Sequence, residues 1–342
     1  MFSRGPMLLW CAGVLLLHVL ASVPSQAETR YIVEDVGENV FVNGIDQYGV
    51  AYGYRLEGPD FDAHGGFFLP QFVPIDPLPG GTSATMLGRL PFYGSVGGST
   101  TAESLGEMHA FYRVNGQMHD LGTLDGNPAN FSIATGLNAT TIVGYASDAR
   151  FFQRPVLWDR HTLTITTLPT LGSYGVVGAA YAISTDGVIV GETAIGGHES
   201  DIHATMWVLG TPYDLTPGGN IDSSAFAINA RHVVVGTRNG NAWRWHPTRG
   251  EKVFDKLPNT TFAELVSVNF AGIAVGRAGV NGEENDAHAI LCDSLTCTDL
   301  NTLHAQPNWV LHNATGINDQ GVIVGEASWK GQRRGYRLSP LR

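Results

Sequence analysis

Lysine is scarce in this chain of 342 residues, in which three lysines accompany seventeen arginines. Such a bias is typical of GC-rich bacterial genomes. Basic side chains are also outnumbered, with 20 lysines and arginines against 31 aspartates and glutamates, and they form no continuous stripe. Because a chain of this charge cannot attract polyanions, we expect neither nucleic acid nor an anionic membrane surface as a partner.

Long apolar runs are missing too, except for one at the N-terminus. It extends from Met7 to Val23, follows the single early charge of Arg4 and leads into Ser-Gln-Ala ending at Ala27. This order is typical of a secretory signal peptide that is cleaved after Ala27. The alternative is an uncleaved membrane anchor, which is disfavoured because the run is interrupted and short for a bilayer.

We therefore expect residues 1–27 to be removed and residues 28–342 to form a single secreted or periplasmic domain. The 315 residues that remain can bury a large core. No second apolar segment is long enough to cross a bilayer, so we expect no membrane insertion of the mature chain.

Cysteine is rare, with three in the whole chain. Cys11 falls in the signal peptide, which leaves Cys292 and Cys297 in "LCDSLTC". A zinc site would need more ligands nearby, and none are there. The short spacing fits a disulfide beside a tight turn in an exported protein, with two free thiols as the alternative.

The sequence also lacks helical periodicity and the usual catalytic signatures. Its 43 glycines and 17 prolines disfavour helix. There is no Gly-x-Ser-x-Gly, His-Glu-x-x-His, phosphate loop, dinucleotide fingerprint or EF-hand loop. We expect no cofactor, although a site assembled from several distant segments would escape such a search.

What the sequence does contain is a repeat. Its main phrase is small-x-Ile-Asn-x-x-Gly-Val-Val-Gly, whose copies end at glycines 53, 144, 191, 236, 276 and 325. These glycines lie 91, 47, 45, 40 and 49 residues apart, and a worn copy at 85–98 divides the longest gap. Asn-x-x-Gly is the chemistry of a tight turn between short strands. Six or seven units of about 45 residues follow, depending on whether 85–98 is a strand pair or a loop.

Each unit is predicted to hold four short strands, because a second phrase such as "RPVLWDRHTLTITTL" (154–168) follows each glycine. That size indicates an all-β, seven-bladed β-propeller, or a six-bladed one if 85–98 is only a loop. The last unit stops after "GYRLSPLR", and its missing strand matches "RYIVEDVG" (30–37). We expect these two segments to pair and close the ring, which protects both edges.

The unit "HAFYRVNGQMHDLGTL" (109–124), followed by "ATGLNATTIVG" (134–144), resembles the HAF repeat of predicted bacterial extracellular proteins. The resemblance spans most of the mature chain and is clearest at 109–144. It implies export and a repeated β architecture. It implies no particular activity.

Residues that recur once per unit are expected to serve the fold, because a catalytic role seldom repeats in every blade. They comprise the strand-opening histidines, the aspartates before a turn and the tryptophans of the third strand: His109, His203 and His288; Asp35, Asp120, Asp214 and Asp299; Trp158, Trp207, Trp243 and Trp245. We expect the histidines to cap strands by hydrogen bonds, the aspartates to cap turns and the tryptophans to pack between blades.

Ligand contacts are expected on the face that carries the second-to-third and fourth-to-first connections, because these connections vary in length. Their polar side chains include Asp60, Asp62, His64, Asp148, Arg150, His198, Glu199, Asp201, Glu283, Glu284, Asp286, Trp329, Arg333 and Arg334. The candidate ligand-binding residues are Glu199, Asp201, Glu283 and Glu284, in the two connections richest in acid. The run "HESDIH" also offers His198, Glu199, Asp201 and His203 as weak metal ligands, but we expect a solvated loop and no metal.

The sequence thus favours an exported, monomeric, non-catalytic propeller that binds a carbohydrate, a peptide or a surface partner. The alternative is a polysaccharide hydrolase or lyase whose acidic residues converge from several blades. Convergence of loop carboxylates beside an aromatic ring near the axis would favour the enzyme.

Overall fold

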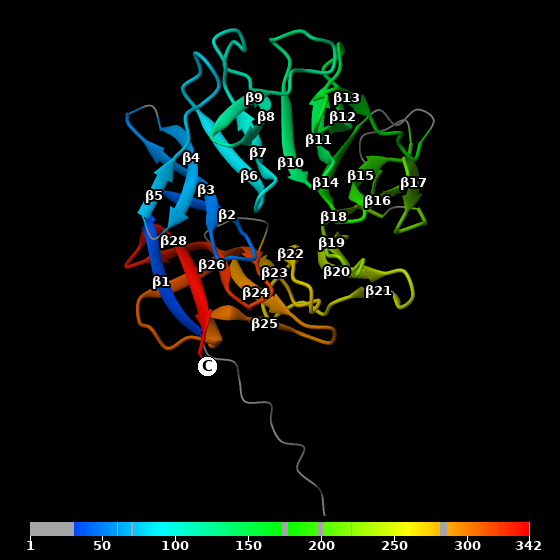
Figure 1. Cartoon of the computed structure of the whole chain (residues 1–342). Helices are drawn as coiled ribbons and strands as arrows, with labels where there is room; N and C mark the ends of the chain where they lie inside the picture. The colour runs from blue at the N-terminus through cyan, green and yellow to red at the C-terminus, as the bar shows by residue number, and fades with distance from the viewer. Residues whose placement is uncertain are drawn as a thin grey trace, which may run out of the picture.

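The computed structural model describes residues 31–59, 61–69, 71–172, 177–196, 201–219, 221–280 and 286–341. They form seven four-stranded antiparallel sheets arranged as the blades of a ring (Figure 1). The predicted seven-bladed β-propeller is confirmed. The six-bladed alternative is wrong, because the worn copy at 85–98 supplies a paired first and second strand.

We number the blades in chain order. Blade 1 holds β2 (Val40–Ile45), β3 (Ala51–Glu57), β4 (Asp62–Leu69) and β5 (Gln71–Pro74), and blade 2 holds β6 (Ala84–Leu90), β7 (Gly94–Ser99), β8 (His109–Val114) and β9 (Gln117–Asp120). Blade 3 holds β10 (Ser132–Leu137), β11 (Thr141–Ser147), β12 (Gln153–Asp159) and β13 (Ile165–Thr167), and blade 4 holds β14 (Gly178–Ile183), β15 (Ile189–Ala194), β16 (Ile202–Val208) and β17 (Thr211–Asp214).

Blade 5 holds β18 (Ser223–Ile228), β19 (Val234–Arg238), β20 (Asn241–His246) and β21 (Gly250–Val253), and blade 6 holds β22 (Phe262–Val268), β23 (Ala274–Gly279), β24 (His288–Cys292) and β25 (Cys297–Asp299). Blade 7 holds β26 (Trp309–Ile317), β27 (Ile323–Trp329), β28 (Gln332–Pro340) and, as its fourth strand, β1 (Tyr31–Glu38). A short 3-10 helix, η2 (Leu300–Thr302), follows β25. Among the described residues, none of the helical structure is long and apolar enough to cross a membrane.

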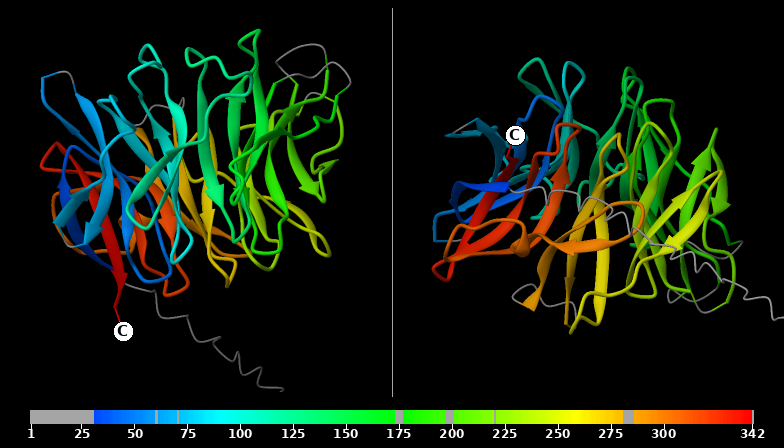
Figure 2. Two further views of the ribbon diagram at one scale, coloured as in Figure 1. Left: turned by 45° about the horizontal axis from the view of Figure 1, so that its top comes forward. Right: turned by 90° about the horizontal axis from the view of Figure 1, so that it is seen from below.

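The first strand of each blade contacts the first strands of both neighbouring blades, from β2 and β6 round to β26 and β2. The first strands therefore line the axis, and the fourth strands lie at the rim (Figure 1). We call the face with the first-to-second and third-to-fourth turns the turn face and the opposite one the loop face. In the left view of Figure 2 the C-terminus marks the turn face, and the loops of the cyan and green blades project from the other edge.

The ring closes as predicted, by pairing of the two ends of the described chain. Strand β1 runs antiparallel to β28, from Tyr31 opposite Pro340 to Glu38 opposite Arg334. The outer edge of β1 is partly covered: the Gln306 amide accepts from the Val33 N–H (2.5 Å) and donates to the Val33 carbonyl (2.7 Å). Covering an edge in this way removes a template for association with other chains.

The asparagine of the repeated turn has two roles. The Asn229 side-chain oxygen accepts from the N–H groups of Arg231 (2.9 Å) and Val233 (3.0 Å), which fixes its own turn. Its nitrogen donates to the Asn269 carbonyl of the next blade (2.7 Å). The same link to the next blade is made by the equivalent asparagines Asn138, Asn269 and Asn318. The motif therefore joins blades near the axis as well as turning the chain.

The glycine that closes each phrase is required by a β-bulge in the first strand. The pairing of β10 with β11 shifts between Ala134 and Gly136, and the other blades have the same irregularity in their first strands. A Cβ atom at Gly144 would overlap the carbonyl oxygen of Ile133. The equivalent glycines at 53, 97, 191, 236, 276 and 325 meet the same obstacle.

Tryptophans of the third strands fill the space between blades, as expected. Trp158, Trp207 and Trp243 are fully buried. Trp243 packs against Val190 and Leu215 of the preceding blade. Burying such large side chains between sheets supplies much of the hydrophobic stabilisation of the ring.

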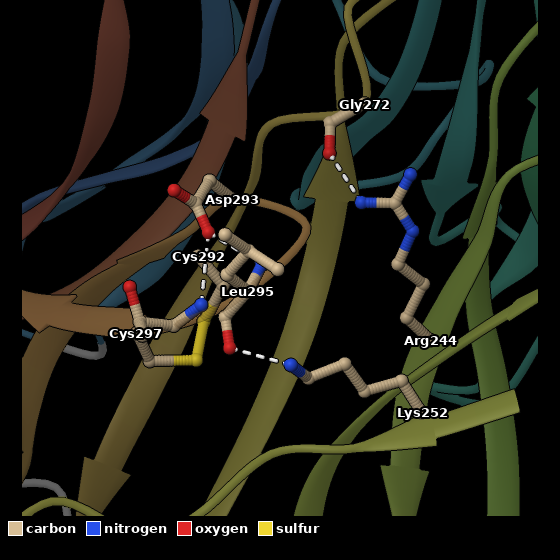
Figure 3. Close-up of a disulfide and its surroundings, with 8 residues drawn as sticks. Arg244, Lys252, Gly272, Cys292, Asp293, Leu295 and Cys297 are labelled. Carbon is tan, nitrogen blue, oxygen red and sulfur yellow. Dashed lines mark hydrogen bonds between the residues drawn. A yellow bond between two sulfur atoms is a disulfide. The ribbon is translucent and has the colours of Figure 1, made fainter.

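The predicted disulfide joins Cys292 and Cys297, which lie directly opposite each other in β24 and β25. Figure 3 shows it at the third-to-fourth turn of blade 6. The Asp293 carboxylate holds this turn by accepting from the Leu295 N–H (2.6 Å), and Lys252 of blade 5 donates to the Leu295 carbonyl (2.5 Å). The bridge therefore reinforces a hairpin that also contacts its neighbouring blade.

Candidate functional site

The recurring histidines and aspartates form pairs within their blades. Nδ1 of His109 lies 3.0 Å from an Asp120 oxygen, and the equivalent distance is 2.8 Å between His203 and Asp214. His288 and Asp299 make the same contact at 2.6 Å. The sequence predicted a strand cap and a turn cap separately, and it did not indicate that they bind each other.

Each of these aspartates also caps a turn with its other oxygen, as expected. Asp120 accepts from the Gly122 N–H at 2.7 Å, and Asp214 accepts from the Thr216 N–H at 2.8 Å. In blade 7, Arg334 replaces the histidine and donates to Asp35 at 3.1 Å. The pair therefore clamps the third strand to the fourth, which is a structural role.

Two of the paired histidines are buried, and their environments differ. Nε2 of His109 lies 3.0 Å from the Pro128 carbonyl, whereas buried Nε2 of His203 has no hydrogen-bond partner among the described residues. The bond to Asp120 raises the pKa of His109, and burial opposes that effect. Neither imidazole is available as a surface ligand.

Most of the predicted binding residues lie outside the described residues: His198, Glu199, Glu283 and Glu284, as do Asp60 and the cleavage residue Ala27. Asp201 is described, and its backbone carbonyl accepts from the Ile195 N–H at 3.0 Å. His203 is directed to Asp214. Within the described ranges, no group of three His, Cys, Asp or Glu side chains is placed to hold a metal.

Two of the described loop carboxylates, those of Asp62 and Asp148, make hydrogen bonds or ion pairs with neighbouring groups. Asp62 accepts from the Ser83 hydroxyl at 3.1 Å. Asp148 accepts from two N–H groups of its own loop and lies 3.3 Å from Nε of Arg154. These contacts order the loops.

Acidic side chains near the axis come instead from the strands. The Glu192 carboxylate accepts hydrogen bonds from Tyr181 (2.8 Å) and Ser224. Burial, with the nearby Glu192 charge, raises the pKa of the Tyr181 hydroxyl. Because the carboxylate is engaged by two hydroxyls, it is a poor candidate for a free general base.

The other two strand carboxylates near the axis are paired with cations. Glu264 lies 2.7 Å from Nε of Arg277 in the same blade. Glu326 lies 3.0 Å from Nη2 of Arg333, whose guanidinium is 4.2 Å from the centre of the Phe41 ring. Each of these strand carboxylates therefore has its own partner, and each partner lies beside an aromatic ring.

In the described part of the loop face, three large apolar side chains of the second-to-third connections are mostly exposed to solvent. Phe61, Leu105 and Phe151 are 67%, 85% and 73% exposed. They occupy the second-to-third connections of blades 1, 2 and 3, and their backbone is left-handed, with φ of 54°, 52° and 64°. Such a conformation is unfavourable for bulky residues. The same connection in blade 5 uses Asn239, a residue suited to it.

The sequence analysis missed these three residues because it considered charged side chains, histidines and one tryptophan in the loops, and no other apolar side chain. Phe61 and Leu105 stand among polar neighbours, in "DFDAH" and "ESLGE", and this contrast was the available signal. Nothing in the local sequence indicated that they occupy equivalent places in adjacent blades.

Neither protein-family models nor curated proteins match this chain. Among solved structures, the chain is similar to an oligogalacturonate lyase from Vibrio parahaemolyticus, with a TM-score of 0.53 and 12% identity over 90% of this chain and 93% of the lyase. It is also similar to a puromycin-hydrolysing peptidase from Mycobacterium tuberculosis, with a TM-score of 0.57 and 11% identity over 90% of this chain and 54% of the peptidase. At these identities the likeness shows the propeller fold alone.

Proposed function

We propose that this protein is an exported, non-catalytic β-propeller that binds a peptide, a protein surface or a carbohydrate through its loop face. The observation that carries the proposal is the set of apolar loop tips, Phe61, Leu105 and Phe151. Solvent exposure of each apolar side chain and its left-handed backbone both cost free energy, and burial in the fold does not offset that cost. A partner that covers the three tips would recover that free energy.

Secretion is part of the proposal. The apolar N-terminal run followed by small residues supports export, and the disulfide between Cys292 and Cys297 supports an oxidising compartment. The resemblance to HAF-repeat proteins is consistent with both. We propose that the mature protein is a monomer, secreted or periplasmic.

The alternative function is a polysaccharide hydrolase or lyase. The lyase from Vibrio shows that a propeller of similar length can support such chemistry. The partners of Glu192, Glu264 and Glu326 favour binding, because each carboxylate is engaged by hydroxyl groups or a guanidinium. A hydrolase or lyase would need a carboxyl group free to move a proton.

The test uses variants that remove the apolar tips and suit the backbone: Phe61→Asn, Leu105→Asn and Phe151→Asn together. Asparagine tolerates left-handed φ, so the triple variant should fold normally. The matched control is Leu209→Asn, which removes a side chain that is 99% exposed at φ 50° on the turn face. Binding is measured on a peptide array and a glycan array.

We expect the triple variant to lose at least about tenfold in affinity for the best array ligand, because three apolar contacts are lost. The Leu209→Asn control should bind like the natural protein. Equal binding by the triple variant would show that the face is wrong. Turnover of any glycan in a parallel hydrolysis screen would favour the enzyme.

A second set of variants tests the acidic connections. Neutralising Glu199, Asp201, Glu283 and Glu284 should leave the melting temperature nearly unchanged, since solvated charges contribute little. The same substitutions should lower the affinity for a cationic or metal-bridged ligand. Unchanged affinity for a cationic array peptide would exclude these residues from the site.

A further inference from the structure

One position in the third strand fills the space between neighbouring blades. It lies opposite the closing glycine, as Phe111 lies opposite Gly97 and Trp243 opposite Gly236. The side chains at this position in blades 2 to 7 are all buried: Phe111, Val156, Thr205, Trp243, Ile290 and Tyr336. The aromatic residues at this position, Phe111, Trp243 and Tyr336, each belong to a hydrophobic cluster that includes residues of the preceding blade.

Blade 1 has a glycine at this position. Its third strand reads "HGGFF" where blade 2 reads "HAFYR", so that Gly66 stands opposite Gly53. The preceding blade in the ring is blade 7, which makes this the junction where the ring closes. The Phe72 ring lies over Gly66 and would obstruct any Cβ atom there.

A groove of about 840 Å³ lies at this junction. It is lined by the end of β1 and the link to β2 (Val36–Val40), by Arg55–Gly58 and by Gln71 and Phe72. The volume is in the range of small-molecule binding sites. Gly66 itself does not line the groove: the Phe72 ring occupies the space that a side chain at Gly66 would need, and Phe72 forms part of the groove wall.

The groove lining combines apolar surface with both kinds of hydrogen-bonding group. Leu56 and Phe72 contribute apolar surface, and the amides of Asn39 and Gln71 can donate and accept. Arg55 is a donor that pairs with Glu57 at 2.9 Å, and both remain partly exposed. Glu38 adds a second carboxylate, which lies 3.6 Å from Nη2 of Arg334, so both carboxylates of the lining are paired with guanidinium groups.

We propose that this groove binds a neutral oligosaccharide. Sugar hydroxyl groups both donate and accept, which matches a lining of amides, carboxylates and one guanidinium. The carbon–hydrogen faces of a sugar ring can pack on Leu56 and Phe72. Because Arg55 is already paired with Glu57, it is poorly placed to hold a phosphate or a uronic acid, which favours a neutral sugar. The groove adjoins the loop face, because its lining includes the link between β1 and β2 and Gly58 of the second-to-third connection of blade 1. The proposal rests on the proposed loop-face function and gives it a ligand class and a location separate from the apolar loop tips.

The test is calorimetric titration of the full protein with cellohexaose, maltohexaose and chitohexaose, with hexagalacturonate as the anionic comparison. The variant is Asn39→Gly with Gln71→Ala, which removes both amides and suits the φ of 54° at Asn39. The matched control is Asn115→Gly with Gln117→Ala in blade 2. Asn115 has φ 52°, and Gln117 begins β9 as Gln71 begins β5.

We expect at least one neutral hexasaccharide to bind with Kd below about 1 mM. The groove variant should bind that hexasaccharide at least about tenfold more weakly because hydrogen bonds are lost, and the control variant should bind it with unchanged affinity. Hexagalacturonate should not bind. The proposal is overturned if no neutral sugar binds, if the groove variant binds normally, or if hexagalacturonate binds equally well. Because the loop tips are unchanged in these variants, array binding separates this result from the proposed loop-face function.

Discussion

At the scale of single residues, repetition identifies structural duties. The histidine that opens a third strand meets the aspartate eleven residues later in three blades. The turn asparagine and the closing glycine likewise have one task each, repeated around the ring. Loop residues that belong to none of these recurring sets, such as Phe61, are free of these duties and are the places to seek function.

The His109–Asp120 pair should make stability depend on pH. The pKa of His109 is raised in the folded protein, so its contribution is fully present below the unfolded pKa and is lost as pH rises through the folded pKa. His109→Gln should therefore lower the melting temperature more at about pH 5.5 than at about pH 9. Thermal unfolding at both values tests this. Asp120→Asn should flatten the same dependence, and an equal loss at both pH values would contradict it.

The closing glycine should tolerate no side chain. Gly144→Ala would force a Cβ atom into the Ile133 carbonyl oxygen, where backbone on both sides resists movement. We expect a loss of about 3 kcal/mol or more in the free energy of unfolding, measured in urea. Gly219→Ala is the control, because open space surrounds that Cβ and its cost should stay within about 0.5 kcal/mol.

At the scale of elements, each blade is a sheet whose hairpins are tied to the next blade. The turn asparagines link first strands near the axis, and Lys252 links the hairpins of blades 5 and 6 (Figure 3). The disulfide adds a covalent tie to one hairpin. Its loop is short, so its effect on the unfolded chain is small.

Removing the disulfide should cost about 2 kcal/mol by the loop-entropy estimate. The variant Cys292→Ala with Cys297→Ala tests this in urea, and the cost should vanish when the natural protein is measured under reducing conditions. Thiol titration of the denatured, unreduced chain from Glu28 onward should find no free thiol. Two titratable thiols would contradict the bridge.

At the scale of the whole molecule, closure of the ring depends on β1, which is the fourth strand of blade 7 although it is first in the chain. Strand β1 has eight residues, whereas the fourth strands of the other blades have three or four. It therefore forms a longer pairing, which joins the two ends of the described chain. We therefore expect the propeller to unfold as one cooperative unit. Its stability should fall sharply when that strand is lost.

Deleting residues 28–37 should expose the edge of β28 and cause aggregation. A circular permutant provides the control. A short turn would join the C-terminus to Tyr31, which already lies opposite Pro340, and new termini would fall between β1 and β2. Light scattering should show a monomeric permutant and an aggregating deletion. A soluble, folded deletion would mean that β1 does not seal the ring.

The sequence by itself determined the architecture. Turn chemistry is local, so a phrase such as Ile-Asn-x-x-Gly predicts a hairpin wherever it occurs, and its spacing indicated six or seven blades. The same locality identified the bridge between Cys292 and Cys297 and the structural character of His109. The strand missing from the last unit revealed the closure.

Only the tertiary structure decided which residues of different strands and blades contact each other, because the sequence repeat indicates local turns and strands. The pairing of His109 with Asp120, the links between turn asparagines and the shared place of Phe61 and Phe151 all depend on register and on neighbouring blades. The groove at Gly66 depends on them most. The glycine is visible in the sequence, but only the tertiary structure shows that Phe72 takes the space beside it and that the link between β1 and β2 forms the other side of the groove, because these segments are distant in the chain.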